Sequence, residues 1–165
     1  MTTDRAAAPT PRNDSCTPSY SGDLRTGLFT AEFGSGTRVP VSVSRTRAYP
    51  GLNSPAPSTL AFYSALQELN FSGPVLDAGA GAGDGARELR LSGRDVVAID
   101  IDHVAVDFAR EYARGARVLE ADLCAQVPVE GMAAAIVADT LGHVADPESF
   151  LRNVRGCLSD GAALL

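Results

Sequence analysis

The 165-residue sequence contains no tryptophan and, although it has 14 basic residues, no lysine, so every basic side chain is arginine. Aspartate and glutamate outnumber arginine by 20 to 14, which gives a formal net charge of −6. Proteins that bind nucleic acid or an anionic membrane through charge need a basic surface. The composition therefore argues against both kinds of partner.

Cysteine and histidine are scarce, with three cysteines and two histidines in the whole chain. Cys16, Cys124 and Cys157 are odd in number, and no two are spaced like a metal clip or a redox pair. We therefore expect no metal site, and reduced thiols in a cytoplasmic protein. Because no apolar run is long enough to span a bilayer and the first residues contain no hydrophobic segment, we also expect neither a transmembrane helix nor a secretory signal.

Composition divides the chain into three parts. Residues 1–23 are rich in Thr, Ser, Pro and Asp and are predicted to be a disordered tail. Residues 24–57 form an N-terminal extension, in which apolar runs at 28–33 and 37–43 predict a small hairpin that lids the site. Pro40 would confine its strand to an edge of the hairpin. Residues 58–165 carry the regular pattern of a folded domain.

Helical and strand patterns alternate along this third part. The helix at 58–69 is expected to turn Leu60, Tyr63, Leu66 and Leu69 inward. Further helices are predicted at 84–91, 103–114 and 147–158, and strands at 74–77, 95–100, 117–121, 133–138 and 162–165. Apolar strands separated by amphipathic helices predict an α/β fold with a doubly wound, mostly parallel sheet. Ligands of such sheets bind beyond the carboxyl ends of the strands.

A glycine-rich turn follows the first strand of this domain, with the sequence DAGAGAGDG from Asp77 to Gly85. Glycines allow the backbone to approach a ligand closely, and two hypotheses fit the turn. A dinucleotide motif fits only if it starts at Gly81 and ends at Ala86, several residues past the strand. Asp77 and Asp84 would then face a diphosphate, and no arginine lies between Pro74 and Ala86 to offset the repulsion.

S-adenosylmethionine is the second hypothesis for the turn. It carries a sulfonium, an ammonium and a carboxylate but no phosphate, so an acidic loop suits it better. The second strand ends at Asp100, which comes 21 residues after Gly79. That spacing is typical of an acidic residue that binds ribose hydroxyls. After the third strand, Asp122 can accept a hydrogen bond from an adenine amine while Leu123 packs on the ring.

From about Pro74 to Leu165 the chain resembles the class I S-adenosylmethionine-dependent methyltransferases of the small-molecule type, with their Rossmann-like fold. The resemblance rests on four blocks in order: VLDAGAGAGDGA, VVAIDIDHVAVDFAR, EADL and AAAIVADTLGHVADPESFLRNVRGCLSDGAALL. It implies that the first block lies under the methionine part of the cofactor, and that the acids after strands two and three meet ribose and adenine. The cofactor-binding residues expected on this basis are Asp77, Ala78, Gly79, Ala80, Gly81, Asp100, Ile101, Asp122, Leu123 and Asp139.

Methyl transfer from a sulfonium is an in-line displacement, in which alignment and desolvation are the main tasks of the enzyme. A base is needed only for an alcohol, a phenol or an acidic carbon. His143 is the one histidine expected near the site and is the candidate catalytic residue. Methyl transfer to a small molecule in specialised metabolism, leaving S-adenosylhomocysteine, is the predicted function.

The resemblance also predicts a seven-stranded sheet, and the sequence ends inside the fifth strand, so we expect a C-terminally incomplete domain. An apolar edge at 162–165 would invite pairing with another chain, in a homo- or hetero-oligomer. This leaves a non-catalytic partner subunit with a methyltransferase fold as an alternative function. A third alternative is an NAD(P)-dependent oxidoreductase that uses the register from Gly81 to Ala86.

Overall fold

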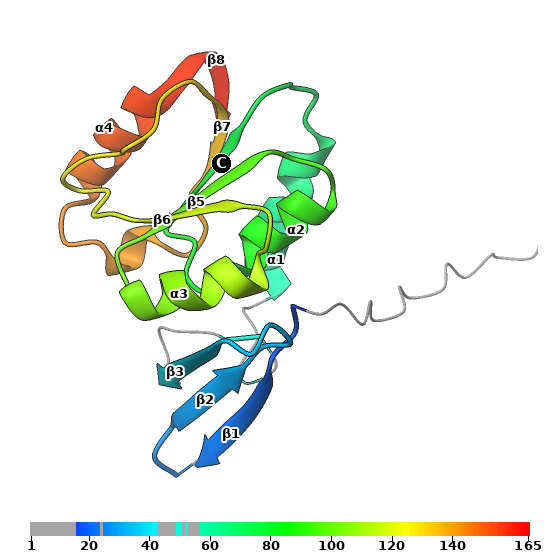
Figure 1. Cartoon of the computed structure of the whole chain (residues 1–165). Helices are drawn as coiled ribbons and strands as arrows, with labels where there is room; N and C mark the ends of the chain where they lie inside the picture. The colour runs from blue at the N-terminus through cyan, green and yellow to red at the C-terminus, as the bar shows by residue number, and fades with distance from the viewer. Residues whose placement is uncertain (1–15, 24, 43–48, 51, 53–56) are drawn as a thin grey trace, which may run out of the picture.

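The computed structural model describes residues 16–23, 25–42, 49, 50, 52 and 57–165. These residues form a five-stranded sheet covered by helices, and a separate three-stranded sheet below it in Figure 1. Residues 1–15 of the predicted tail, and most of the segment between the predicted hairpin and the first helix, lie outside the described residues.

The larger sheet is parallel throughout, with the strand order β6-β5-β4-β7-β8. Its strands are β4 (Val75–Ala78), β5 (Val96–Asp100), β6 (Arg117–Glu120), β7 (Met132–Ile136) and β8 (Leu158–Leu164). The helices are α1 (Pro57–Glu68), α2 (Asp84–Leu91), α3 (His103–Tyr112) and α4 (Pro147–Cys157), with a short 3-10 helix η1 (Leu141–His143). The predicted doubly wound α/β fold is confirmed.

Alternation along the strands gives the sheet two different faces. Val75 and Asp77 of β4 point toward α1 and α2, where Tyr63, Leu66 and Leu89 complete a buried cluster. Leu76 and Ala78 point to the other face, toward α4 and the loop before β7. Each face is buried under helices, as a parallel sheet requires.

Two aspartates cap the N-terminal ends of helices α3 and α4. Asp102 Oδ1 accepts a hydrogen bond from the backbone N–H of Val104, and Asp146 Oδ1 accepts one from that of Ser149. Each carboxylate satisfies a backbone donor that the first turn of a helix leaves without a partner. Pro147 follows at the first helical position, where its missing N–H costs nothing.

The smaller sheet corrects one prediction and confirms another. Strands β2 (Leu28–Glu32) and β3 (Arg38–Ser42) form the predicted antiparallel hairpin, with Pro40 in an edge strand. However, β1 (Ser19–Asp23) pairs with β2, so the assignment of residues 19–23 to a disordered tail is wrong. Its pairing uses backbone hydrogen bonds, which need no apolar side chains. Tyr20 also donates a hydrogen bond to the backbone oxygen of Pro50.

Two details of the larger domain also differ from expectation. Leu69 is 39% exposed rather than turned inward, because α1 ends at Glu68 and the chain leaves the helical path there. The side chain of Leu60 lies outside the described residues. Strand β8 begins four residues before the predicted 162, since Leu158 already pairs with Met132. The residues that interrupt the register include Gly161, at φ 77°.

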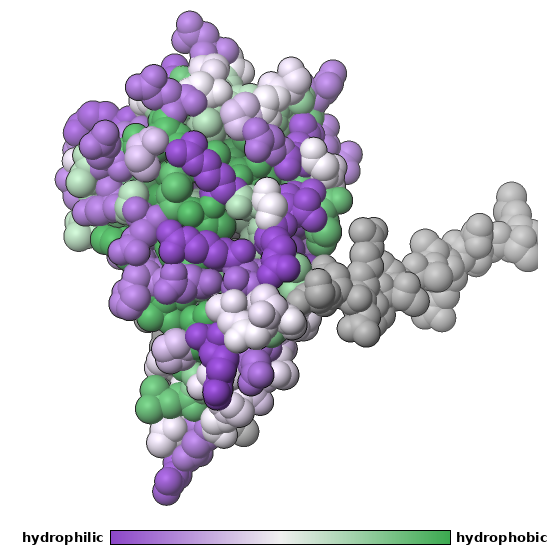
Figure 2. All heavy atoms as spheres, viewed as in Figure 1, coloured by the Kyte–Doolittle hydropathy of each residue, from purple (hydrophilic) through white to green (hydrophobic). Residues whose placement is uncertain are grey.

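The surface mixes polar and apolar groups. On the face in Figure 2, hydrophobic residues show through the α/β part between hydrophilic side chains. Ile101 is the most exposed large hydrophobic residue of the described chain, at 65% exposure. Within the described residues, no helix has the length and apolar character needed to cross a membrane.

Candidate functional site

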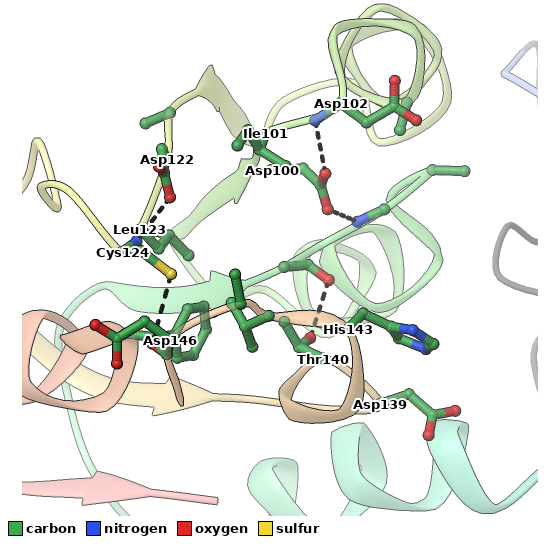
Figure 3. Close-up of a pocket in the computed structure, with 18 of the residues that line it drawn as sticks. Asp100, Ile101, Asp102, Asp122, Leu123, Cys124, Asp139, Thr140, His143 and Asp146 are labelled. Carbon is green, nitrogen blue, oxygen red and sulfur yellow. Dashed lines mark hydrogen bonds between the residues drawn. The ribbon is translucent and has the colours of Figure 1, made fainter. Parts of the chain in front are cut away.

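A cavity of about 660 Å³ opens beyond the carboxyl ends of β4, β5, β6 and β7 (Figure 3). This is a typical volume for a site that holds a small organic ligand. Eight of the predicted site residues line it: Gly79, Gly81, Asp100, Ile101, Asp122, Leu123, Asp139 and His143. Asp77, Ala78 and Ala80 do not line it.

The glycine-rich turn between β4 and α2 is fixed by its neighbours. The backbone N–H groups of Gly79 and Ala80 both donate to the carbonyl oxygen of Ile99 at the end of β5, at 2.8 and 3.0 Å. Gly79 has φ 82°, a left-handed conformation that favours glycine. A Cβ atom at this position would lie 2.4 Å from Thr140 Oγ1. The turn therefore lies directly against the segment that follows β7.

Asp100 bridges two backbones at the cavity wall. Its Oδ2 accepts from the N–H of Gly81 at 2.8 Å, and its Oδ1 accepts from the N–H of Asp102 at 2.9 Å (Figure 3). A carboxylate can accept about four hydrogen bonds, so each oxygen keeps capacity for a ligand hydroxyl. Asp100 thus joins the end of β5 to the glycine-rich turn and offers acceptors to the cavity.

The loop after β6 is held in a similar way. Asp122 Oδ1 accepts from the backbone N–H of Cys124 at 2.8 Å, and Leu123 is buried against the sheet. Asn153 of α4 donates to the carbonyl oxygens of Leu123 and Cys124, each at 2.9 Å. The loop therefore presents a carboxylate and an apolar side chain to the cavity in a fixed conformation.

The opposite wall comes from residues that follow β7. Asp139 has φ 58°, the one positive value among the described non-glycine residues. Aspartate tolerates this conformation better than most residues, and strained backbones of this kind concentrate at functional sites. His143 ends η1 and is exposed. Asp139, Thr140 and His143 lie together on this side in Figure 3, across from Asp100 and Asp122.

Asp77 lies beneath the turn and is completely buried. The hydroxyl of Tyr63 in α1 donates to its Oδ1 at 2.9 Å. Burial raises the pKa of Asp77 to about 7, although the hydrogen bond from Tyr63 lowers it and Asp100 raises it. Asp77 therefore supports the turn from inside the core instead of meeting a ligand in the cavity.

The cavity is acidic. Five aspartates line it, namely Asp100, Asp102, Asp122, Asp139 and Asp146, and the described lining includes no arginine. Asp84 stands nearby at the start of α2, and burial raises its pKa to about 6 against a hydrogen bond from Tyr112. A helix start that receives a phosphate offers backbone N–H groups and no carboxylate. The lining suits a ligand with positive charge and ribose hydroxyls, and does not suit a diphosphate.

Sequence reasoning missed several lining residues, among them Thr140, Cys124 and Asp146. Thr140 could have been found as a polar residue just past the end of β7. Tyr49 comes from the segment predicted to lid the site; it is 1% exposed, lines the cavity and packs edge-on against Phe108 of α3 at 5.1 Å between ring centroids. No sequence pattern indicated that Tyr49 would pack against Phe108.

Residues 76–165 match a family model described as a methyltransferase domain. The sequence has no match among curated proteins. Among solved structures, the chain resembles a TehB-like S-adenosylmethionine-dependent methyltransferase from Corynebacterium glutamicum, with 24% identity and a TM-score of 0.57 over 64% of this chain and 60% of that one. The match to a methyltransferase domain favours the second hypothesis for the glycine-rich turn over a dinucleotide.

Two further structures share the fold. One concerns the conversion of a disulfide bond into a thioacetal group during echinomycin biosynthesis (25% identity, TM-score 0.58, 72% of this chain and 52% of that one). The other is a glycopeptide N-methyltransferase complexed with sinefungin (16% identity, TM-score 0.57, 72% of this chain and 53% of that one). The chain spans between 52% and 60% of the length of these three structures.

Proposed function

The chain belongs to the methyltransferase domain family, as a class I S-adenosylmethionine-dependent methyltransferase, and from this premise we propose that it methylates a small-molecule acceptor. The observation that carries the proposal is the position of Asp100, bonded to the N–H of Gly81 at the wall of an acidic cavity without arginine among its described lining. A carboxylate held there can accept hydrogen bonds from both ribose hydroxyls of the cofactor.

The residues divide into a cofactor side and an acceptor side. On the cofactor side, Asp122 accepts a hydrogen bond from the adenine amine, while Ile101 and Leu123 pack against the adenine ring. Gly79 and Gly81 bring the backbone close to the methionine part. S-adenosylmethionine supplies a methyl group that is already activated, so the protein has to align the reactants and exclude water.

On the acceptor side, Asp139 and His143 border the place where a methyl acceptor would enter. Asp139 contacts the cofactor near the methyl group in this proposal. His143 acts as a base if the acceptor is an alcohol, a phenol or an acidic carbon. An exposed imidazole at the cavity wall can pass the proton on to water. Tyr49 of the N-terminal extension lines the cavity, and in this proposal the extension covers the bound reactants from that side.

The setting of the reaction is part of the same proposal. The structure linked to echinomycin biosynthesis supports a small-molecule acceptor in specialised metabolism. The odd and widely spaced cysteines support a cytoplasmic protein. Strand β8 lies at one edge of the five-stranded sheet and offers a surface for a second chain, so a homo- or hetero-oligomer formed there is also proposed.

Calorimetric titration of the full chain tests the cofactor proposal. S-adenosylhomocysteine should bind, and NAD and NADP should not. Asp100→Ala should weaken that binding by roughly 1–3 kcal/mol, the scale for lost hydrogen bonds to a charged group. Asp107→Ala, which removes an exposed aspartate of α3 that pairs with Arg110, is the matched control and should leave the affinity unchanged. Equal affinity in wild type and Asp100→Ala would refute the placement of the ribose.

A further inference from the structure

Tyr63 does not line the cavity, yet it contacts residues on both sides of the glycine-rich turn, Asp77 and Gly85. Its hydroxyl donates to Asp77 Oδ1 at 2.9 Å, and Asp77 is the only charged side chain that is completely buried among the described residues. Asp77 lies in β4, two residues before Gly79. The hydrogen bond thus joins α1 to the strand end from which the turn departs.

The second point of contact lies at the other end of the turn. A Cβ atom at Gly85 would lie 1.9 Å from the ring of Tyr63, so the ring packs directly on the backbone of the first turn of α2. Tyr63 itself is 5% exposed and sits in the cluster that also holds Ala86 and Leu89. One side chain therefore spans both ends of the turn, at β4 and at α2.

We infer that Tyr63 is a positioning residue for the cofactor: its hydroxyl and ring hold the turn from Gly79 to Gly83 in the conformation that receives S-adenosylmethionine. The inference rests on the proposed function and deepens it, because it makes cofactor affinity depend on a helix that contributes nothing to the described lining of the cavity.

Several groups face Asp77 and govern its charge. Besides Tyr63 of α1, Asp100 at the end of β5 and Asp84 at the start of α2 raise its pKa, and the backbone N–H of Ala86 lowers it. Asp139, beyond β7, acts on Tyr63. With three carboxylates around the pair, Tyr63 is the side chain that stabilises the charged form of Asp77. Removal of the hydroxyl makes ionisation of this buried carboxylate more costly, and the cost is felt at higher pH.

The test is the dissociation constant of S-adenosylhomocysteine, measured by calorimetry with the full chain at about pH 6 and about pH 8. Tyr63→Phe keeps the ring and removes the hydroxyl. We expect it to weaken binding roughly twofold at the lower pH and roughly tenfold at the higher pH, since the lost bond involves a charged partner only when Asp77 is ionised. Adding Asp77→Asn to Tyr63→Phe should remove this pH dependence.

Ser35→Ala is the matched control, because it also removes a hydroxyl that donates to a carboxylate, Glu111 Oε2 at 2.8 Å, but at an exposed position outside the cavity lining. It should change the affinity less than twofold, about the limit of such measurements. A Tyr63→Phe protein that binds as wild type does, or that loses affinity equally at both pH values, would overturn the inference and leave the proposed function standing. A wild-type protein that does not bind the ligand would overturn both.

Tyr63→Phe could fail to fold, because it buries a charge without its side-chain donor. The double variant Tyr63→Phe/Asp77→Asn buries no charge and is then compared with Asp77→Asn alone at about pH 7. A loss of roughly threefold or more in the double variant supports a positioning role for the hydroxyl, since the amide oxygen introduced by Asp77→Asn still accepts a hydrogen bond from Tyr63 in the single variant. Equal affinity of the two variants overturns it.

Discussion

The two faces of the five-stranded sheet are both buried, but they are built differently. Under α4, the cluster around Leu76 and Ala78 is formed by buried hydrophobic residues. Under α1 and α2, the cluster includes Tyr63 and lies around the buried carboxylate of Asp77. Apolar packing tolerates no gap but is indifferent to pH, whereas a buried carboxylate couples stability to pH. The face with the carboxylate is also the one that supports the glycine-rich turn.

The largest effect is expected on the apolar face. Leu76→Ala should destabilise the protein by about 2–5 kcal/mol, because it removes a completely buried side chain and leaves a cavity. The loss, measured by urea unfolding, should be the same at about pH 5 and pH 8. Leu164→Ala, at a leucine that is 45% exposed, is the control and should cost far less. A strong pH dependence of the Leu76→Ala loss would contradict the statement that only the face with Asp77 couples stability to pH.

On the other face, Asp77 should make the protein less stable as the pH rises. Its pKa is raised from 3.8 to about 7, so between these values the folded state holds a proton that the unfolded state has released. Stability is therefore lost progressively as the pH rises from about 4 to about 7. At about 1.4 kcal/mol for each pKa unit, the total is on the order of 4 kcal/mol.

Asp77→Asn isolates this contribution, because the amide cannot ionise. Asp84, with a pKa of about 6, adds a change of the same sign at lower pH and is present in both proteins. The difference in unfolding free energy between wild type and variant should therefore grow in favour of the variant up to about pH 7 and then level off. A difference that does not change with pH would show that Asp77 is not buried as described.

The smallest of these effects concerns the contact between Tyr63 and Gly85. Gly85→Ala should cost about 1–3 kcal/mol, the usual range for overpacking, because the new methyl group would collide with the tyrosine ring. Gly156→Ala in α4 is the matched control, since nothing lies within 4 Å of its added Cβ. There alanine should stabilise the helix by up to about 1 kcal/mol. If Gly85→Ala were also stabilising in thermal unfolding, the ring would not be held against α2.

The sequence was sufficient for much of the fold. The strands and helices from residue 75 onward and the hairpin with Pro40 at its edge follow from local patterns. The predictions for β1 and Leu69 were wrong for related reasons. A polar strand such as β1 forms because a neighbouring strand, β2, is available for pairing. Whether Leu69 is buried depends on where α1 ends. Neither can be recognised from the local sequence.

The candidate site was likewise predicted in part from the sequence. Eight of the eleven predicted residues line the cavity because acids and glycines at strand ends can be recognised from their spacing. Asp77 was predicted to meet the cofactor, and the structure buries it behind the turn. Residues at alternate positions of a strand point to opposite faces, and only the placement of α1 decided what Asp77 would meet.

The amino-acid order alone determined which segments form strands and helices, and the helix caps at Asp102 and Asp146, because each depends on residues close together in the chain. Only the tertiary structure decided that Tyr63 would reach Asp77, 14 residues away, and that Thr140 would lie against Gly79, 61 residues away. Such contacts depend on how whole helices pack on the sheet, and the packing is set by the total burial of both faces rather than by any local pattern.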